Sequence, residues 1–159
     1  MIFRRKRKEQ VEQKQDKRAI KIISVTIDDI RSAVNQFAIN LDEGISLRSI
    51  ISDNHEIDFE LLHSYLGGKP DKPFYMSKET FEIFEDAKYP KHIDFCQIAC
   101  DQYFLETGAE PIIPGDPSNQ VSYFKLQNYL VQKPPFDLYL DSNDRMVTHR
   151  KPSNRERKE

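Results

Sequence analysis

Residues 121–146 read VSYFKLQNYLVQKPPFDLYLDSNDRM, and residues 57–82 read IDFELLHSYLGGKPDKPFYMSKETFE. When the two stretches are aligned at an offset of 64, their apolar, aromatic and turn-forming residues occur in the same order. Between residues 57 and 76 the aligned positions include six identities: Leu62/Leu126, Tyr65/Tyr129, Leu66/Leu130, Lys69/Lys133, Pro70/Pro134 and Tyr75/Tyr139. Because self-similarity at a fixed spacing indicates a repeated structural unit, the chain is predicted to use this unit twice.

A second pair of similar segments precedes the first pair. Residues 27–37 align with residues 93–103 at an offset of 66 and share four identities: Ile27/Ile93, Asp28/Asp94, Ala33/Ala99 and Gln36/Gln102. The two blocks occur in the same order in each half, and the loop between them is two residues longer in the first half. This order predicts tandem repeats over residues 26–86 and 92–150.

Each half begins with a predicted helix. Thr26 and Asp29 match the pattern of a capping box, and apolar residues recur at helical spacing behind them, so a helix is predicted over residues 27–40. Its counterpart is predicted over residues 93–106, with Gly108 placed to end it.

A short second helix and a hairpin complete each half. The second helices are predicted over residues 59–66 and 123–130, with Asp58 and Ser122 as their N-caps. Hairpins follow over residues 74–84 and 138–149, where apolar triplets flank polar turns. Extended segments join the two helices of each half, at residues 45–51 and 111–114.

These elements predict an α+β fold made of two tandem helix–extended–helix–hairpin repeats. A half of about 60 residues buries too little surface to be stable alone, which favours one joint core. We therefore expect a single domain over residues 22–150 with approximate two-fold symmetry. In this arrangement the hairpins form a mixed or antiparallel sheet that the helices cover.

The net charge of −2 conceals a strong segregation of charge. Residues 1–21 carry +6 and residues 145–159 carry +4, whereas residues 22–144 carry −12. Because residues 1–21 hold almost no apolar side chains after Phe3, they are predicted to form a disordered basic arm. Residues 151–159 are predicted to form a basic tail on the acidic body.

The basic arm is a candidate for contact with an anionic surface. Its consecutive basic residues are Arg4, Arg5, Lys6, Arg7 and Lys8. At about 1 kcal/mol per basic residue, a membrane contact through them is weak and transient for one copy. Nucleic acid attracts the same charges, but the acidic body opposes its close approach. A solvated arm without a binding role is the other interpretation.

The two cysteines of the chain, Cys96 and Cys100, follow His92 at intervals of four on the predicted helix. Structural zinc sites use four ligands in short Cys/His clusters, and no second cluster occurs, so neither a metal site nor a cofactor is predicted. A disulfide within one helical turn has poor geometry. Buried, reduced thiols are the favoured interpretation, which suits a cytoplasmic protein.

Catalytic signatures are not evident in the sequence. It contains no nucleophile elbow, no phosphate-cradling glycine-rich loop and no metalloprotease helix. The adjacent carboxylates Asp28 and Asp29 have a local role at a helix N-terminus, where negative charge is favoured. Glu85 and Asp86 suit a solvated acidic face. No catalytic residue is therefore predicted, and an enzyme is disfavoured.

Tyr75 and Tyr139 occupy the same place in the two predicted hairpins. One interpretation makes them sheet or core residues related by the repeat. The other makes them the aromatic lining of a binding groove between the two halves, where ligands often bind. These two tyrosines are the candidate binding residues.

Several short strings resemble those of a known protein family. The strings are Tyr65-Leu66-Gly67-Gly68, Phe74-Tyr75-Met76-Ser77-Lys78-Glu79-Thr80, Ile113-Pro114-Gly115-Asp116-Pro117 and Val121-Ser122-Tyr123. Over about residues 25–152, and in its short basic N-terminus, the chain resembles a family of small uncharacterised proteins from Bacillus-type Gram-positive bacteria. The resemblance implies a bacterial setting and transfers no catalytic residue.

Three functions are compatible with these features. The favoured one is a non-catalytic binding or protein-interaction module in the cytoplasm. The second is peripheral contact with the inner face of a membrane, or with nucleic acid, through the basic arm. The third is a small enzyme with a site between the repeats. Another protein or an anionic membrane surface is favoured as the partner over nucleic acid.

Overall fold

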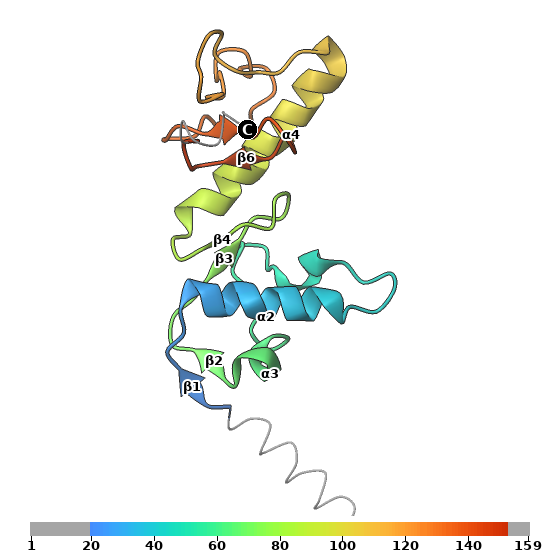
Figure 1. Ribbon diagram of the computed structural model, residues 1–159, viewed down its shortest axis with the longest axis vertical. Coiled ribbons are helices and arrows are strands. Elements are labelled where there is room, and N and C mark those ends of the chain that lie inside the picture. Colours follow the sequence, from blue (N-terminus) through green and yellow to red (C-terminus); the bar gives the residue numbers. More distant parts are fainter. Residues whose placement is uncertain (1–19, 153–159) are drawn as a thin grey trace, which may run out of the picture. The chain divides into compact units, whose positions relative to one another are not determined.

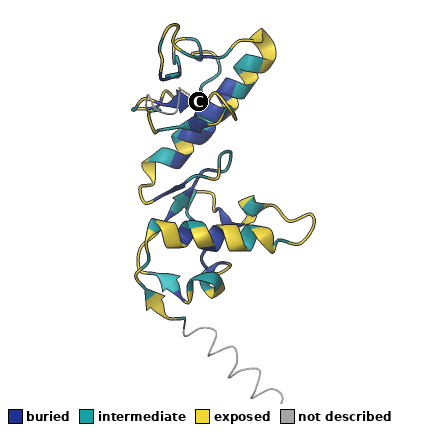
Figure 2. Cartoon of the chain, viewed as in Figure 1, coloured by how far each residue is buried: buried dark blue, intermediate teal, exposed yellow. Residues whose placement is uncertain are grey.

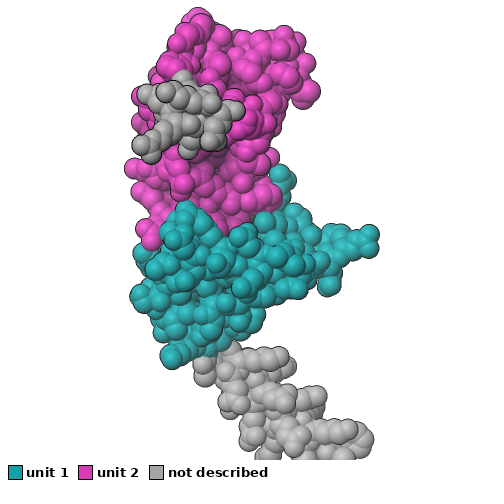
Figure 3. All heavy atoms as spheres, viewed as in Figure 1, with its two compact units in different colours: residues 1–52, 57–73 teal, residues 53–56, 74–159 magenta. Residues whose placement is uncertain are grey.

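The computed structural model describes residues 20–152 (Figure 1). This part of the chain divides into two compact units (Figure 3). Unit 1 contains residues 20–52 and 57–73, and unit 2 contains residues 53–56 and 74–152. The division does not follow the predicted repeats, because the first hairpin belongs to unit 2.

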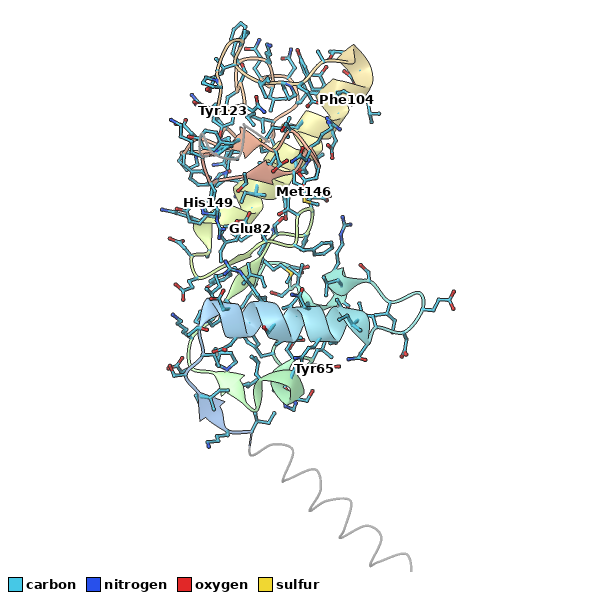
Figure 4. The ribbon with its side chains drawn as sticks, viewed as in Figure 1. Tyr65, Glu82, Phe104, Tyr123, Met146 and His149 are labelled. Atoms are coloured by element: carbon cyan, nitrogen blue, oxygen red, sulfur yellow. The ribbon has the colours of Figure 1, made fainter. Side chains whose placement is uncertain are left out.

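Unit 1 is built around one helix. Its elements are strand β1 (Ile22–Ile23), helix α2 (Ile27–Ile39), the 3-10 helix η1 (Leu47–Ile50), helix α3 (His63–Leu66) and strand β2 (Lys69–Pro70). Helix α2 packs against α3, and the rings of Phe37 and Tyr65 meet edge to face with centroids 6.3 Å apart (Figure 4). Strands β1 and β2 pair in parallel.

The start of α2 confirms the capping box. The Thr26 hydroxyl accepts a hydrogen bond from the Asp29 amide at 3.2 Å, and the Asp29 carboxylate accepts one from the Thr26 amide at 2.9 Å. These bonds satisfy two of the amide groups that a helix leaves unpaired at its N-terminus. The helix buries Ile30, Ala33 and Val34 and exposes its other face (Figure 2).

The pairing of β1 with β2 depends on a glycine. The amides of Lys69 and Asp71 donate to the carbonyls of Lys21 and Ile23 at 2.8 and 2.9 Å. A Cβ on Gly68 would lie 2.5 Å from the Lys21 carbonyl oxygen, so β1 approaches this closely only because residue 68 has no side chain.

Residues 133–134, which lie 64 positions after β2, form no strand. Gln132 stands where the earlier stretch has Gly68, and its side chain would meet an approaching strand. Pro135 stands where the earlier stretch has Asp71, and proline has no amide hydrogen to donate. These two sequence differences explain why β2 pairs with β1, whereas residues 133–134 pair with no strand of the described chain.

Unit 2 combines two hairpins with the longest helix of residues 20–152. Its elements are β3 (Tyr75–Met76), β4 (Ile83–Phe84), α4 (Lys88–Thr107), β5 (Tyr139–Leu140) and β6 (Val147–Thr148). The hairpins β3–β4 and β5–β6 are antiparallel, and both contact α4. The buried face of α4 contributes Ile93, Cys96, Ala99 and Cys100 to a core closed by Phe84, Val121, Leu126, Leu138, Leu140 and Val147.

Unusual backbone conformations recur 64 residues apart. His55 and Asn119 have φ of 70° and 54°, and Phe81 and Arg145 both have φ of 59°. Positive φ is uncommon for residues other than glycine. Backbone hydrogen bonds recur at the same offset. The Met76 amide donates to the His55 carbonyl, as the Leu140 amide does to that of Asn119. The Phe81 amide donates to the Ser77 carbonyl, as the Arg145 amide does to that of Asp141.

The mixture of helices and short sheets confirms the α+β class. The helix predicted over residues 123–130 is wrong, because these residues form successive turns. A segment this short gains little from helical hydrogen bonds, and packing decides its shape. The α-helix within 59–66 is limited to His63–Leu66, and the extended segment 45–51 contains η1.

Two further predictions are corrected. Helix α4 begins at Lys88 rather than residue 93, because the Asp86 carboxylate accepts a hydrogen bond from the Lys88 amide at 2.9 Å and Pro90 is tolerated in the first turn. The hairpins also form no common sheet. Residues 20–152 contain separate two-stranded sheets, since each hairpin packs on α4 instead of pairing with the other.

Replacing Gly68 with alanine tests the close approach of β1. We expect Gly68→Ala to displace β1, to cost about 1–3 kcal/mol of unfolding free energy, and to speed hydrogen exchange at the Lys69 and Asp71 amides. Gly44→Ala is the control, because no atom lies within 4 Å of the new Cβ there. Its φ of 87° adds backbone strain at residue 44 alone, so exchange at the Lys69 and Asp71 amides should not change. Unchanged exchange in Gly68→Ala would contradict the explanation.

Candidate functional site

A pocket of about 470 Å³ lies in unit 2 between the two hairpins. Its lining comes from three segments. The first hairpin contributes Thr80 and Glu82, the second contributes Asp141, Asp144, Met146, Val147 and Thr148, and the residues that follow the second hairpin in the chain contribute Arg150, Lys151 and Pro152. Two lining pairs, Thr80/Asp144 and Glu82/Met146, are 64 residues apart. The pocket therefore lies between positions of the two hairpins that are 64 residues apart in the chain.

Asp94 of α4 holds the first hairpin. Its side chain is buried, with the residue 7% exposed, and it accepts a hydrogen bond from the Ser77 hydroxyl. The amides of Lys78 and Glu79 donate to the same carboxylate at 2.9 and 3.0 Å, and His55 Nε2 lies 2.9 Å from Oδ2. A buried carboxylate needs such partners. The turn after β3 is thus fixed to the helix.

Gln97, one helical turn further along α4, holds the second hairpin. Its Oε1 accepts a hydrogen bond from the Val147 amide at 2.7 Å, and its Nε2 donates to the Arg145 carbonyl at 3.0 Å. Residues three apart on a helix lie on one face. One face of α4 therefore positions both walls of the pocket.

Charges of both signs line the pocket. The carboxylate of Glu82 lies 3.7 Å from Nε of Arg150. It also lies 3.5 Å from Nδ1 of His149, which does not line the pocket (Figure 4). The carboxylates of Asp141 and Asp144 accept hydrogen bonds from the amides of Asn143 and Met146, at 2.7 and 2.9 Å, and so shape the second turn. Met146 adds an apolar surface that is 41% exposed.

His149, between the lining residues Thr148 and Arg150 in the chain, packs in an aromatic cluster. Its ring lies 5.1 Å from the ring of Phe84 and 4.7 Å from that of Tyr89, measured between centroids. Burial lowers the pKa of His149, and the neighbouring Arg150 lowers it further. His92, whose ring lies 5.6 Å from Phe136, also has a pKa lowered by burial. Both rings therefore favour the neutral form.

The candidate tyrosines both lie in hairpin strands of unit 2. Tyr139 is buried at 8% exposure, and burial raises the pKa of its hydroxyl. Tyr75 is partly exposed and forms an isolated bridge with Glu56, as Tyr139 does with Gln120. Neither tyrosine lines the pocket between the hairpins.

The cysteines lie in the core of unit 2. Cys96 and Cys100 are fully buried, unpaired by a disulfide, and have sulfur atoms 3.9 Å apart. The hydrogen bond with Cys96 and burial raise the pKa of the Cys100 thiol, which disfavours the reactive thiolate. Residues 20–152 contain no group of three His, Cys, Asp or Glu side chains placed to hold a metal ion.

The basic run Arg4, Arg5, Lys6, Arg7 and Lys8 lies outside the described residues. The prediction of an anionic-surface contact through these residues therefore stays a prediction. Within residues 20–152, no helix is long and apolar enough to cross a membrane.

A second pocket of about 480 Å³ lies beside the loop that precedes β5. It is lined by Tyr123, Lys133, Pro134, Pro135, Phe136 and Asp137. The Tyr123 hydroxyl donates to the Phe136 carbonyl at 2.7 Å, and burial raises its pKa. This hydrogen bond holds the proline-rich loop closed on the turns at 123–129.

Sequence reasoning did not identify Asp94 and Gln97 as positioning residues. Their signal is the placement of two polar residues among the apolar residues of the predicted buried stripe, beside Ile93 and Cys96. Polar groups on a buried face need hydrogen-bond partners. The identity of those partners depends on contacts 15 to 50 residues away, which the sequence pattern does not specify.

Comparison with protein families places the chain. Residues 20–149 match the family described as a protein of unknown function, DUF3939, and the chain belongs to this family. Comparison with curated proteins gave no match, and comparison with solved structures gave none. The expected membership of an uncharacterised family is confirmed, while the Bacillus-type origin stays a prediction.

Asp94→Asn tests the attachment of the first hairpin. An amide nitrogen cannot accept the hydrogen bonds that the carboxylate now receives, so we expect a loss of about 2–4 kcal/mol in unfolding free energy, measured by urea denaturation. Asp28→Asn is the matched control, since the Asp28 side chain is 84% exposed and its ion pair with Arg31 lies at the surface. We expect that change to cost less than about 1 kcal/mol. Equal losses would refute the assignment.

The partly buried histidines predict a pH dependence. Because the folded pKa of His149 lies below the unfolded value of about 6.5, the unfolded chain binds more protons just below that pH. Unfolding free energy should therefore fall as the pH drops from about 7.5 towards 5.5. His149→Phe, which keeps an aromatic ring, should flatten the profile, and Lys72→Gln in unit 1 should not. An unfolding free energy that rises on acidification would contradict a lowered pKa of His149 in the folded chain.

Proposed function

We propose that this protein is a non-catalytic binding module that takes a segment of another protein into the pocket between its two hairpins. The observation that carries the proposal is the pocket itself, which two hairpins form and one helix face positions. Pockets of roughly 300–1,000 Å³ suit small ligands and short peptide segments.

The chemistry of the lining favours a peptide. The carboxylates of Glu82, Asp141 and Asp144 line the pocket together with the cations of Arg150 and Lys151 and the apolar side chain of Met146. A peptide offers charges of both signs, backbone amides and carbonyls, and apolar side chains within a few residues. A lining of mixed charge complements such a ligand better than it complements a simple anion or cation.

The buried polar groups of α4 have structural roles, which supports binding over catalysis. The Asp94 carboxylate receives hydrogen bonds from a hydroxyl and two backbone amides and lies beside His55, so it has little capacity left to act as a base. The Cys100 thiol is buried and held protonated. A reaction would need an activated group in contact with the ligand.

We also propose that the two halves arose as a tandem repeat, with residues 26–86 and 92–150 as the copies. The positive-φ residues His55/Asn119 and Phe81/Arg145, together with their accompanying hydrogen bonds, support this origin. Strained backbone positions are retained where surrounding contacts hold them. On this proposal the pocket lies between corresponding parts of two related hairpins.

A pocket-filling variant tests the proposed site. Panning a random peptide display library on the full chain should enrich peptides whose affinity falls at least about tenfold in Met146→Trp, because the indole occupies the pocket. Val131→Trp is the control, since Val131 is exposed but does not line the pocket. The proposal fails if no peptide is enriched, or if the enriched peptides bind Met146→Trp as tightly as the natural chain.

A further inference from the structure

The outer face of α4 carries apolar residues that are exposed or partly exposed. Ile98 is 50% exposed and Leu105 is 83% exposed, while Phe95 is partly exposed on the same face. With the exposed Gln102, these residues follow the spacing 95, 98, 102 and 105, which alternates three and four residues. This alternation is the pattern of a seam where two helices pack side by side. The opposite face of α4 already packs in the core of unit 2.

Charge is distributed unevenly along this face. Lys91 lies near the helix start, with its ammonium 5.8 Å from the ring centroid of Phe95. Glu106 lies near the helix end and is exposed. At 100° per residue, all six positions fall within an arc of about 100°. The face thus has a basic end, an apolar centre and an acidic end.

We propose that this face, residues 91, 95, 98, 102, 105 and 106 of α4, is a self-association surface on which two copies of the chain pair with their α4 helices antiparallel. A two-fold axis at the level of residue 100 places Phe95 of one copy opposite Leu105 of the other, and Ile98 opposite Gln102. The same register brings Lys91 to the end that carries Glu106. A two-fold interface uses one patch on both copies, so the patch must complement itself.

The charges at the two ends of this face favour a second copy of the chain as the partner and an antiparallel orientation of the two α4 helices. A parallel pair would place Lys91 against Lys91 and Glu106 against Glu106, which like-charge repulsion disfavours. An antiparallel pair matches opposite charges at both ends and also opposes the two helix dipoles favourably. None of these residues lines the pocket between the hairpins, so the proposal goes beyond the proposed function and stands apart from it.

Sedimentation velocity of the full chain, from low micromolar to submillimolar concentration, tests the surface. We expect a reversible dimer whose dissociation constant rises at least about tenfold in Leu105→Glu. Val131→Glu is the matched control, because Val131 is 79% exposed, much as Leu105 is, but lies on the loop before β5. We expect that variant to dimerise normally.

Charge reversal tests the orientation. Lys91→Glu and Glu106→Lys should each weaken the dimer, and the double variant should restore it, because the two charges exchange places across the interface. Tyr129→Phe controls for the hydrogen bond that the Tyr129 hydroxyl donates to Glu106 and should leave the dimer intact. A chain that stays monomeric, a dimer indifferent to Leu105→Glu, or a double variant weaker than both single ones would overturn the proposal.

Discussion

The buried carboxylate of Asp94 is the interaction on which the architecture of unit 2 depends. An ionised group removed from water is costly unless hydrogen bonds replace its hydration. Here the Ser77 hydroxyl and the amides of Lys78 and Glu79 replace it, and all three belong to one turn. The Asp94 carboxylate can stay buried only while the turn after β3 stays against α4. Detaching the first hairpin from α4 would therefore destabilise unit 2.

Gln97 attaches the second hairpin to α4 through a neutral side chain. Its amide both donates and accepts, so it satisfies a carbonyl and an amide of the second hairpin without burying a charge. The two hairpins are therefore held by different chemistry on adjacent turns of α4. Asp28, the residue 66 positions before Asp94, lies at the surface of α2 instead. The two aspartates thus have different roles. Asp94 lies on α4, which contacts the hairpin before it and the hairpin after it in the chain, whereas Asp28 lies on α2, which packs against α3.

Local signals predicted local structure well. The capping box at Thr26, the left-handed Gly108 that ends α4, and both hairpins follow from side chains a few residues apart, and the structure contains them. The apolar spacing over residues 123–130 predicts a helix where the structure has turns at 123–129, because such spacing in a short segment fits either form. Their conformation is decided by packing of Leu126 into the core, which no local pattern records.

The pocket could not be predicted, because it depends on which helix each hairpin contacts. The sequence assigns the first hairpin to the first predicted repeat, whereas the turn of this hairpin is bound by Asp94, which lies in the second predicted repeat. Hairpin patterns specify strand pairing and turn type but not the surface on which a hairpin packs. That choice is made by the few polar groups that need buried partners, since an unsatisfied carboxylate costs more than a misplaced apolar contact. Polar residues on a predicted buried face are therefore the sequence feature most informative about how such a protein assembles.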